Sequence, residues 1–451
     1  MASTKITLVG GGSYPWTPGM LRNVLGNKRL NGSHVVMHDI DPEPLALTYR
    51  LALKCKEISG TDTTFEQTTD QAAALEGADY VVVTISTGRL KTMRVDLEVP
   101  EKYGIFQPVG DTVGPGGLSR ALRNVPVFLQ MAQAMEKRCP KAWMLNLSNP
   151  LSALTRVVNK ETGIRALGVC HGVIGTARDY ARFLGAKLEE CSYVNSGIDH
   201  CSWFPRFLVK GRSAEELLQE RGVDKWLAKP PAEAERDHTF GGLYHYRCGL
   251  QLWRALGVLP AIGDRHMAEF LPTYLRGLDN VRKYGLVRTT IADREGYYVK
   301  ARARIERWLS GAEKLDLPPA TDVVGARQSD DIAAWIVALS GGPALEDNVN
   351  MPNLGQIPEL PLGAVVETRA VLDGSGAHPL ASPLPKQLVP IVRPHVLRQE
   401  LTMEAALEGS FEKALAALAT DPLLDGIETA RPLLEEMLAA NKDWLPQFRT
   451  V

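Results

Sequence analysis

The sequence predicts an α/β protein in which a Rossmann-like, doubly wound parallel sheet is followed by a mixed α+β second domain. Three observations support this prediction. A strand-like run at 5–9 leads directly into a glycine-rich turn at 10–12. Strand and helix patterns then alternate through the first third of the chain, which is typical of parallel sheets with right-handed crossovers. From about residue 165 the pattern becomes mixed, so we expect domains at 1–165 and 166–451.

The predicted elements of the first domain follow one another closely. DYVVVTIS is continuously apolar and β-branched, as a strand buried on both faces should be. The expected strands are KITLVGG, HVVMHDID, TTFEQTTD, DYVVVTIS and AWMLNLSNP, and the expected helices are PGMLRNVLGN and ALTYRLALKCKEIS.

The second domain mixes strands and helices, an organisation similar to that of lactate and malate dehydrogenases. We expect a loop at 347–361, because DNVNMPNLGQIPELP is rich in asparagine, proline and glycine. The expected strands are IRALGVCHG, a strand-turn-strand unit at 192–212 and a strand at 364–372; helical patterns lie around 308–317, at 330–342 and from 385 to 445.

Composition limits the classes of function. The 451 residues are 45% hydrophobic and 23% charged with a net charge of −1, so no strong field would recruit nucleic acid or an anionic membrane. We find no secretory signal and no run of ~18 apolar residues that would span a membrane. The cysteines have no framework spacing, which favours reduced thiols in the cytoplasm. They are Cys55, Cys139, Cys170, Cys191, Cys201 and Cys248.

The first turn carries signals for a dinucleotide. Gly10 and Gly12 follow a strand and precede a helix, so backbone N–H groups can approach a pyrophosphate there, and Ser13 belongs to the same loop. Asp39 ends the second strand, where a carboxylate accepts from a ribose hydroxyl and repels a 2′-phosphate; this favours NAD over NADP. Thr84 begins the loop that ends the DYVVVTIS strand. The alternative for these residues is an ordinary tight turn and a plain strand exit.

Two further stretches are candidates for substrate binding. GDTVGPGGLSRALRNVP places a flexible loop before a helix N-terminus, and Asp111 in it can bind a sugar hydroxyl. Arg89 and Arg94 follow the third strand and can reach phosphates or substrate. The alternatives are a simple Gly-Pro turn and a solvated basic turn.

Cys170 and His171 stand side by side at a strand exit, the edge at which parallel sheets bind ligands. A thiolate and an imidazole suit a cation such as Mn, Fe, Co, Ni or Zn, and His200 lies at another turn beside a strand. There are two alternatives: Cys170 is a nucleophile, or it is a buried residue that only packs in the core.

These motifs together resemble glycoside hydrolase family 4, the NAD- and divalent-metal-dependent glycosidases. The resemblance covers nearly the whole chain. It rests on VGGGS with HDID, EKYGIFQPVGDTVGPGGLSRALRNVP, NLSNP, CHGV, the DH pair at 199–200, DNVNMPNLGQIPELP and LTMEAALEGSFEKALAALATDPL.

The resemblance implies Cys170 and His200 as ligands of a Mn-like cation, and it places Asn149 near substrate and nicotinamide. It implies transient oxidation of the sugar at C3 by NAD, removal of the C2 proton, elimination of the aglycon, addition of water and return of the hydride, rather than displacement by paired carboxylates. In this scheme the base is expected at Asp264, and His171 protonates the leaving group. Asp199 stands where the family commonly has asparagine.

The residues around this base complete the expected site. Arg265 and His266 are expected to bind sugar hydroxyls or a carboxylate. Tyr244 and Tyr246 are the alternative bases. For Asp264 the competing interpretation is a helix N-cap, and for the tyrosines it is aromatic packing.

The Cys-His-Gly form resembles family members that act on non-phosphorylated α-glycosides, including glucosidases and glucuronidases, whereas GDTVGPGG is closer to the α-galactosidase pattern. A 6-phosphoglycosidase of the same family is one alternative, a lactate/malate-type dehydrogenase the second and a non-catalytic sensor the third. The resemblance also implies a homodimer or homotetramer.

Overall fold

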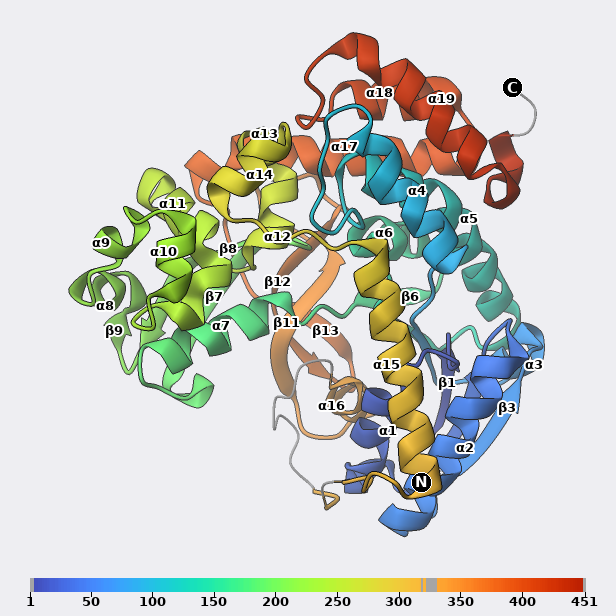
Figure 1. Ribbon diagram of the computed structural model, residues 1–451. Helices are drawn as coiled ribbons and strands as arrows, with labels where there is room; N and C mark the ends of the chain where they lie inside the picture. The colour runs from blue at the N-terminus through green and yellow to red at the C-terminus, as the bar shows by residue number, and fades with distance from the viewer. Residues whose placement is uncertain (1–3, 318, 322–330, 449–451) are drawn as a thin grey trace.

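The structure, a computed structural model, describes residues 4–317, 319–321 and 331–448. Its centre is one mixed sheet, drawn in Figure 1 with helices on both faces. In the parallel half the strand order is β3-β2-β1-β4-β5-β6, which is the doubly wound order, so the predicted fold class is confirmed. These strands are β1 (Lys5–Val9), β2 (His34–His38), β3 (Thr64–Thr68), β4 (Tyr80–Val83), β5 (Trp143–Asn146) and β6 (Arg165–Gly168).

The antiparallel half continues the same sheet. Asn350 pairs with Gly168, and this pair joins β11 to β6. The sheet is thus continuous where we expected the domains to divide, and the division at 165 stays a prediction. The further strands are β7 (Cys191–Ile198), β8 (Cys201–Val209), β9 (Arg212–Ser213), β10 (Leu259–Pro260), β11 (Leu345–Pro352), β12 (Val365–Asp373) and β13 (Gly376–Pro379).

The core lies on both faces of the parallel strands. In β4, Val81 and Val83 pack in one apolar cluster, while Tyr80 and Val82 pack in another on the opposite face. This alternation explains the continuous apolar run predicted for a doubly covered strand. The helices that follow the first strands are α1 (Thr17–Leu25), α2 (Pro42–Ser59), α3 (Gln71–Leu75), α4 (Arg89–Glu101), α5 (Gly114–Arg138), α6 (Leu151–Glu161) and α7 (Gly172–Phe183).

The remaining helices include two groups, while α15 packs against α2 and α4 and α16 packs against α1. In Figure 1 the C-terminal helices α17, α18 and α19 lie together over α5, while α8 to α11 cluster beside α7. Within the described ranges no helix is both long and apolar enough to cross a membrane. These helices are α8 (Ala214–Glu220), α9 (Val223–Leu227), α10 (Pro231–Arg236), α11 (Arg247–Leu256), α12 (Asp264–Met267), α13 (Pro272–Leu275), α14 (Leu278–Tyr284), α15 (Ile291–Ser310), α16 (Ile332–Leu339), α17 (Val389–Glu408), α18 (Phe411–Ala419) and α19 (Ala430–Ala440).

Two expectations about local structure are wrong. The expected loop at 347–361 begins with most of β11, which pairs with β12 from Leu345 to Pro352. Asparagine favours loops, but Asn350 is a buried strand residue whose side chain donates to Glu367. The helical pattern around 308–317 ends at Ser310, because Gly311 adopts a left-handed conformation with a φ of 78°.

Candidate active site

The expected site residues gather at the carboxyl edge of the parallel strands. The glycine turn follows β1, Asp39 follows β2 and Thr84 follows β4. Asn149 comes after β5, and Cys170 comes after β6. Because parallel strands all end at this edge, residues up to 160 positions apart in the chain share one crevice.

The glycine turn is built so closely that side chains do not fit. Gly10 has a φ of 91°, and a Cβ on it would lie 2.6 Å from the carbonyl oxygen of Thr84. A Cβ on Gly12 would lie 2.8 Å from the Asp39 carboxylate, which accepts the Gly12 N–H at 3.1 Å. Ser13 closes the turn by donating its N–H to the Gly10 carbonyl at 3.0 Å. Asp39 and Thr84 therefore lie against the turn that contains Gly10, Gly12 and Ser13, so the five expected cofactor residues are close together.

The two arginines expected after the DYVVVTIS strand, which is β4, differ in position. Arg89 forms ion pairs with Asp39 at 3.3 Å and with Asp41 at 2.8 Å, so it lies at the glycine turn. Arg94 is half exposed and forms ion pairs with Glu98 and Glu295. No contact brings Arg94 to the other site residues within the described ranges, and its role in substrate binding stays a prediction.

A candidate cation site lies where β6 meets the turn between β7 and β8. One ligand atom each from Cys170, Asp199 and His200 lies within 4.8 Å of the others, and Asp111, His200 and His266 form a second such group. Both carboxylate oxygens of Asp199 are buried without a hydrogen-bond partner. Unpartnered buried oxygens beside a thiol and an imidazole are the donor set that a divalent cation satisfies.

Burial controls the protonation of this cation site. It raises the pKa of the Cys170 thiol and that of Asp199, the latter to about 7, and it lowers the pKa of His200. His200 has a φ of 63°, a costly conformation for a residue other than glycine that is typical of functional sites. The turn therefore holds His200 in place at a cost in backbone energy.

A short hydrogen-bond relay fixes the tautomer of His200. The Thr112 hydroxyl donates to Asp111 at 2.8 Å and lies 2.7 Å from Nδ1 of His200. Because that hydroxyl carries one proton, it accepts from His200, so Nδ1 is the protonated nitrogen and Nε2 is left as the ligand atom. Asn149 donates to the other oxygen of Asp111 at 3.1 Å. The expected residues Asp111 and Asn149 are thus in contact.

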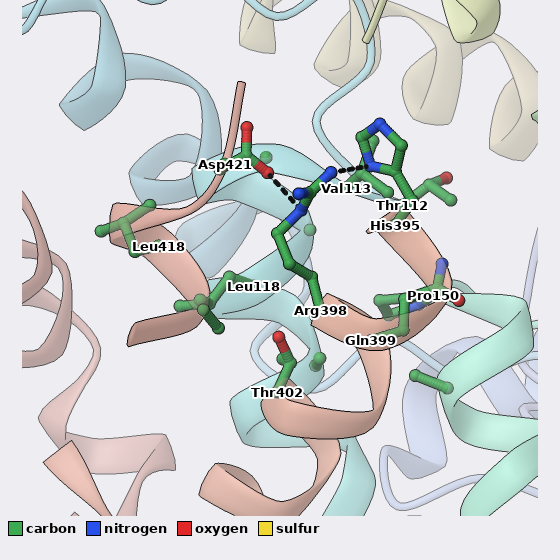
Figure 2. A pocket seen from close by; sticks show the side chains of 15 residues that line it. Thr112, Val113, Leu118, Pro150, His395, Arg398, Gln399, Thr402, Leu418 and Asp421 are labelled. Carbon is green, nitrogen blue, oxygen red and sulfur yellow. Dashed lines mark hydrogen bonds and ion pairs between the residues drawn. The ribbon is translucent and has the colours of Figure 1, made fainter. Parts of the chain in front are cut away.

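The loop that carries Asp111 is held from two sides. Glu269 accepts the N–H groups of Val109 and Gly110, each at 2.7 Å. On the other side Asp421 accepts the Gly114 N–H and lies 3.8 Å from Arg398. Figure 2 shows Arg398 between Asp421 and His395 in a small cavity beside Thr112 and Val113. The loop is therefore braced, not flexible as its glycines suggested. Its last glycines lie in the first turn of α5, where they permit close packing.

The remaining expected residues lie around this centre. The His266 ring is 3.7 Å from the His200 ring between centroids, and Arg265 is its neighbour in α12. His171 precedes α7 and is exposed. Burial, with a smaller contribution from the charge of His171, lowers the pKa of both His200 and His266. The ring contact places His266 at the candidate cation site, with Arg265 next to it in the chain.

The candidate bases are Asp264, the first residue of α12, and Tyr246, which directly precedes α11. The Asp264 carboxylate is buried and accepts the N–H groups of Cys248 and Gly249 at the start of α11, both at 2.8 Å. Burial raises the pKa of Asp264 to about 7. The Tyr246 hydroxyl donates to Asp179 at 2.7 Å, and its ring packs on Tyr180. Asp264 thus caps α11 and not the helix that follows it in the chain, whose N-cap is Gly263, and the catalytic roles of Asp264 and Tyr246 stay predictions.

Sequence reasoning missed three residues of the site. Asp199 was seen only as a departure from a family pattern, although it directly precedes His200. Thr112 and Glu269 carried no signal of their own, because their partners are 88 and about 160 positions away in the chain.

Two models of one known protein family match the chain. The model of the family 4 glycosyl hydrolases matches residues 5–186, and that of the family 4 C-terminal domain matches residues 195–424. The chain belongs to glycosyl hydrolase family 4. As a family 4 enzyme it is a glycoside hydrolase, and the resemblance stated from the sequence is confirmed.

Several known proteins are similar to this chain over nearly its whole length. The α-galacturonidase of Thermoanaerobacterium saccharolyticum is 34% identical over 98% of this chain and 97% of its own, and the α-galacturonidase of Bacillus subtilis is 32% identical over 96% of both. The crystal structure of lplD from Bacillus subtilis has a TM-score of 0.85 at 31% identity, covering 97% of this chain and all of that one. A 6-phospho-α-glucosidase from gut microorganisms, solved with NAD and Mn2+, shares the fold with a TM-score of 0.80 at 22% identity, covering 99% of this chain and 100% of that one.

Proposed function

We propose that this glycoside hydrolase uses NAD and a divalent cation, Mn2+ first, to cleave a non-phosphorylated α-glycoside of a hexuronic acid, with an α-galacturonide as the first candidate. One observation supports it above the others: a dinucleotide turn and a Cys–Asp–His cation site lie at the same edge of one sheet. The Cys-His-Gly sequence at 170–172 supports a substrate without a phosphate. The α-galacturonidase relatives support the uronic acid.

The residues present fit NAD. The turn leaves no room for a Cβ at Gly10 or Gly12, so the backbone at the start of α1 can lie close to a pyrophosphate. Asp39 faces the same turn and accepts from a ribose hydroxyl. When bound, NAD supplies a hydride acceptor for C3 of the sugar, and the cation supplies a Lewis acid for the oxygens on C2 and C3.

Side chains of the protein transfer the protons and orient the sugar. Asp264 takes the proton from C2, since a base with a pKa of about 7 is half deprotonated at neutral pH. His171, exposed at the rim, protonates the leaving oxygen. Asp111 and Asn149 orient sugar hydroxyls, and the His266 ring packs against the His200 ring.

The substrate is tested by hydrolysis of four p-nitrophenyl α-glycosides: galacturonide, galactoside, glucoside and 6-phosphoglucoside. Each is incubated with and without NAD and Mn2+, in the presence of a reductant that protects Cys170. We expect the galacturonide to be cleaved only when NAD and Mn2+ are both added, with no net formation of NADH. Net NADH from the free sugar without hydrolysis would contradict the proposal and favour a dehydrogenase.

Changing Asp39 to alanine is expected to raise the Kd for NAD about 10- to 100-fold, because a hydrogen bond to a charged group contributes roughly 1.5–3 kcal/mol. The measurement is NAD titration by calorimetry. Asp41→Ala is the matched control, because Asp41 pairs with the same Arg89 but does not contact Gly12. Equal losses in both variants would assign the effect to Arg89 and not to the Asp39 carboxylate.

Changing Thr112 to valine is expected to weaken Mn2+ binding about 10- to 100-fold, the usual effect of removing a group that orients a histidine ligand. Thr112→Ser keeps the hydroxyl and should retain most of the affinity. Electron paramagnetic resonance of free Mn2+ measures both. Binding to Thr112→Val with the affinity of the unchanged protein would show that the relay does not orient His200.

We also propose a cytoplasmic homodimer or homotetramer. All six cysteines are thiols in the structure, as expected for a reducing compartment. Light scattering of the purified protein gives the oligomeric state directly.

A further inference from the structure

Two arginines near the cation site lack the counter-ion that buried arginines normally have. Arg265 is half buried on α12, and Arg294 is half buried in the first turns of α15. Neither forms an ion pair with any carboxylate of the described chain. The Nε atom of each is buried without a hydrogen-bond partner. A buried guanidinium with open donors is costly and indicates a missing anionic partner.

Arg265 is held in place by neutral groups alone. It donates to the Pro108 carbonyl at 3.3 Å and to the Thr289 hydroxyl. These contacts fix its position without neutralising its charge. Its neighbour His266 lies against His200, so Arg265 is one residue from the cation site.

Arg294 acts on the same place from another helix. Its backbone N–H donates to the Thr290 carbonyl at 3.2 Å, and Thr290 directly follows Thr289, whose hydroxyl accepts from Arg265. Three carboxylates act on Arg265, and each accepts from other groups: Asp111 from Thr112 and Asn149, Glu269 from two backbone N–H groups, and Asp293 from Thr290. The Nε–H groups of both arginines therefore remain open to an anion from outside the chain.

We infer that Arg265 and Arg294 together bind the C6 carboxylate of a uronic acid in the sugar site. The planar guanidinium matches a carboxylate with two parallel hydrogen bonds, and a single negative charge suits a pocket that already contains Asp111. This inference rests on the proposed function. It adds the residues that distinguish a uronide from the corresponding neutral sugar.

The test compares Arg265→Gln and Arg294→Gln with the unchanged enzyme, with NAD and Mn2+ present. Two ratios are measured: kcat/KM for the galacturonide over the galactoside, and affinity for free D-galacturonate over D-galactose by calorimetry. Both ratios should fall about 10- to 100-fold in each variant, the loss of a charge-assisted hydrogen bond. Arg304→Gln is the matched control, because Arg304 lies on the same helix, is exposed and pairs with Glu313.

The outcomes separate the inference from the proposed function. Unchanged ratios in both variants would overturn the carboxylate site while leaving the hydrolase intact. Preference of the unchanged enzyme for the 6-phosphoglucoside would also overturn it, because the anion would then be a phosphate. If no glycoside is cleaved, the proposed function fails, and the calorimetric ratio alone decides whether these arginines bind a uronate.

Discussion

Replacing Cys170 by serine is expected to abolish Mn2+ binding at micromolar concentrations and to lower kcat/KM by about a thousandfold or more. The thiolate is one of three donors in the Cys170–Asp199–His200 group, and serine replaces this anionic donor by a neutral hydroxyl. A Lewis acid contributes several kcal/mol to such a reaction, where each ~1.4 kcal/mol is tenfold in rate. Mn2+ titration and steady-state kinetics measure the two effects.

The control for this change is Cys191→Ser, at the start of β7. Cys191 is half-buried and its thiol donates to the Lys187 carbonyl, so it tests the loss of a thiol away from the cation site. Both variants should have the melting temperature of the unchanged protein within a few degrees. Full activity of Cys170→Ser would exclude Cys170 as a ligand and leave the buried-filler interpretation.

Replacing Asp264 by asparagine is expected to lower kcat by about 100- to 10,000-fold, the usual contribution of a general base. A base must be deprotonated, so the rate of the unchanged enzyme should rise with pH through about 7 and then level off. In Asp264→Asn this rise should vanish. The pH dependence of kcat/KM between pH 5 and 9 is the measurement.

Asp264 also caps α11, so loss of activity alone does not establish a base. Asparagine keeps one acceptor for the two N–H groups, and the melting temperature reports any loss of the cap. Tyr246→Phe provides the comparison, because its hydroxyl is engaged with Asp179. If Tyr246→Phe removes the pH dependence while Asp264→Asn keeps it, Tyr246 is the base and our assignment is wrong.

The parallel half of the fold was predictable because its signals are local. A strand buried on both faces is a continuous apolar run, and the glycine turn follows it directly in the chain. The same holds for the site residues at the strand ends, since topology alone brings Asp39, Thr84 and Cys170 to one edge.

The antiparallel half was less predictable because its interior is polar. Asn350 and Glu367 sit in strands yet lie buried in contact with each other, a pattern that the alternation of apolar residues does not reveal. The relay from Asp111 through Thr112 to His200 likewise depends on a contact 88 positions apart. Such partners are set by tertiary packing, which a single sequence does not record.

The central claim is that the glycosidic bond is broken after proton removal from C2, and hydrolysis in D2O tests it most directly. The p-nitrophenyl α-galacturonide is cleaved with NAD and Mn2+ present, and the released sugar is analysed by NMR before solvent exchange. The account predicts deuterium at C2 of the product, because the proton taken by the base equilibrates with solvent. A product that carries only hydrogen at C2 would indicate direct displacement at C1 and would contradict the account.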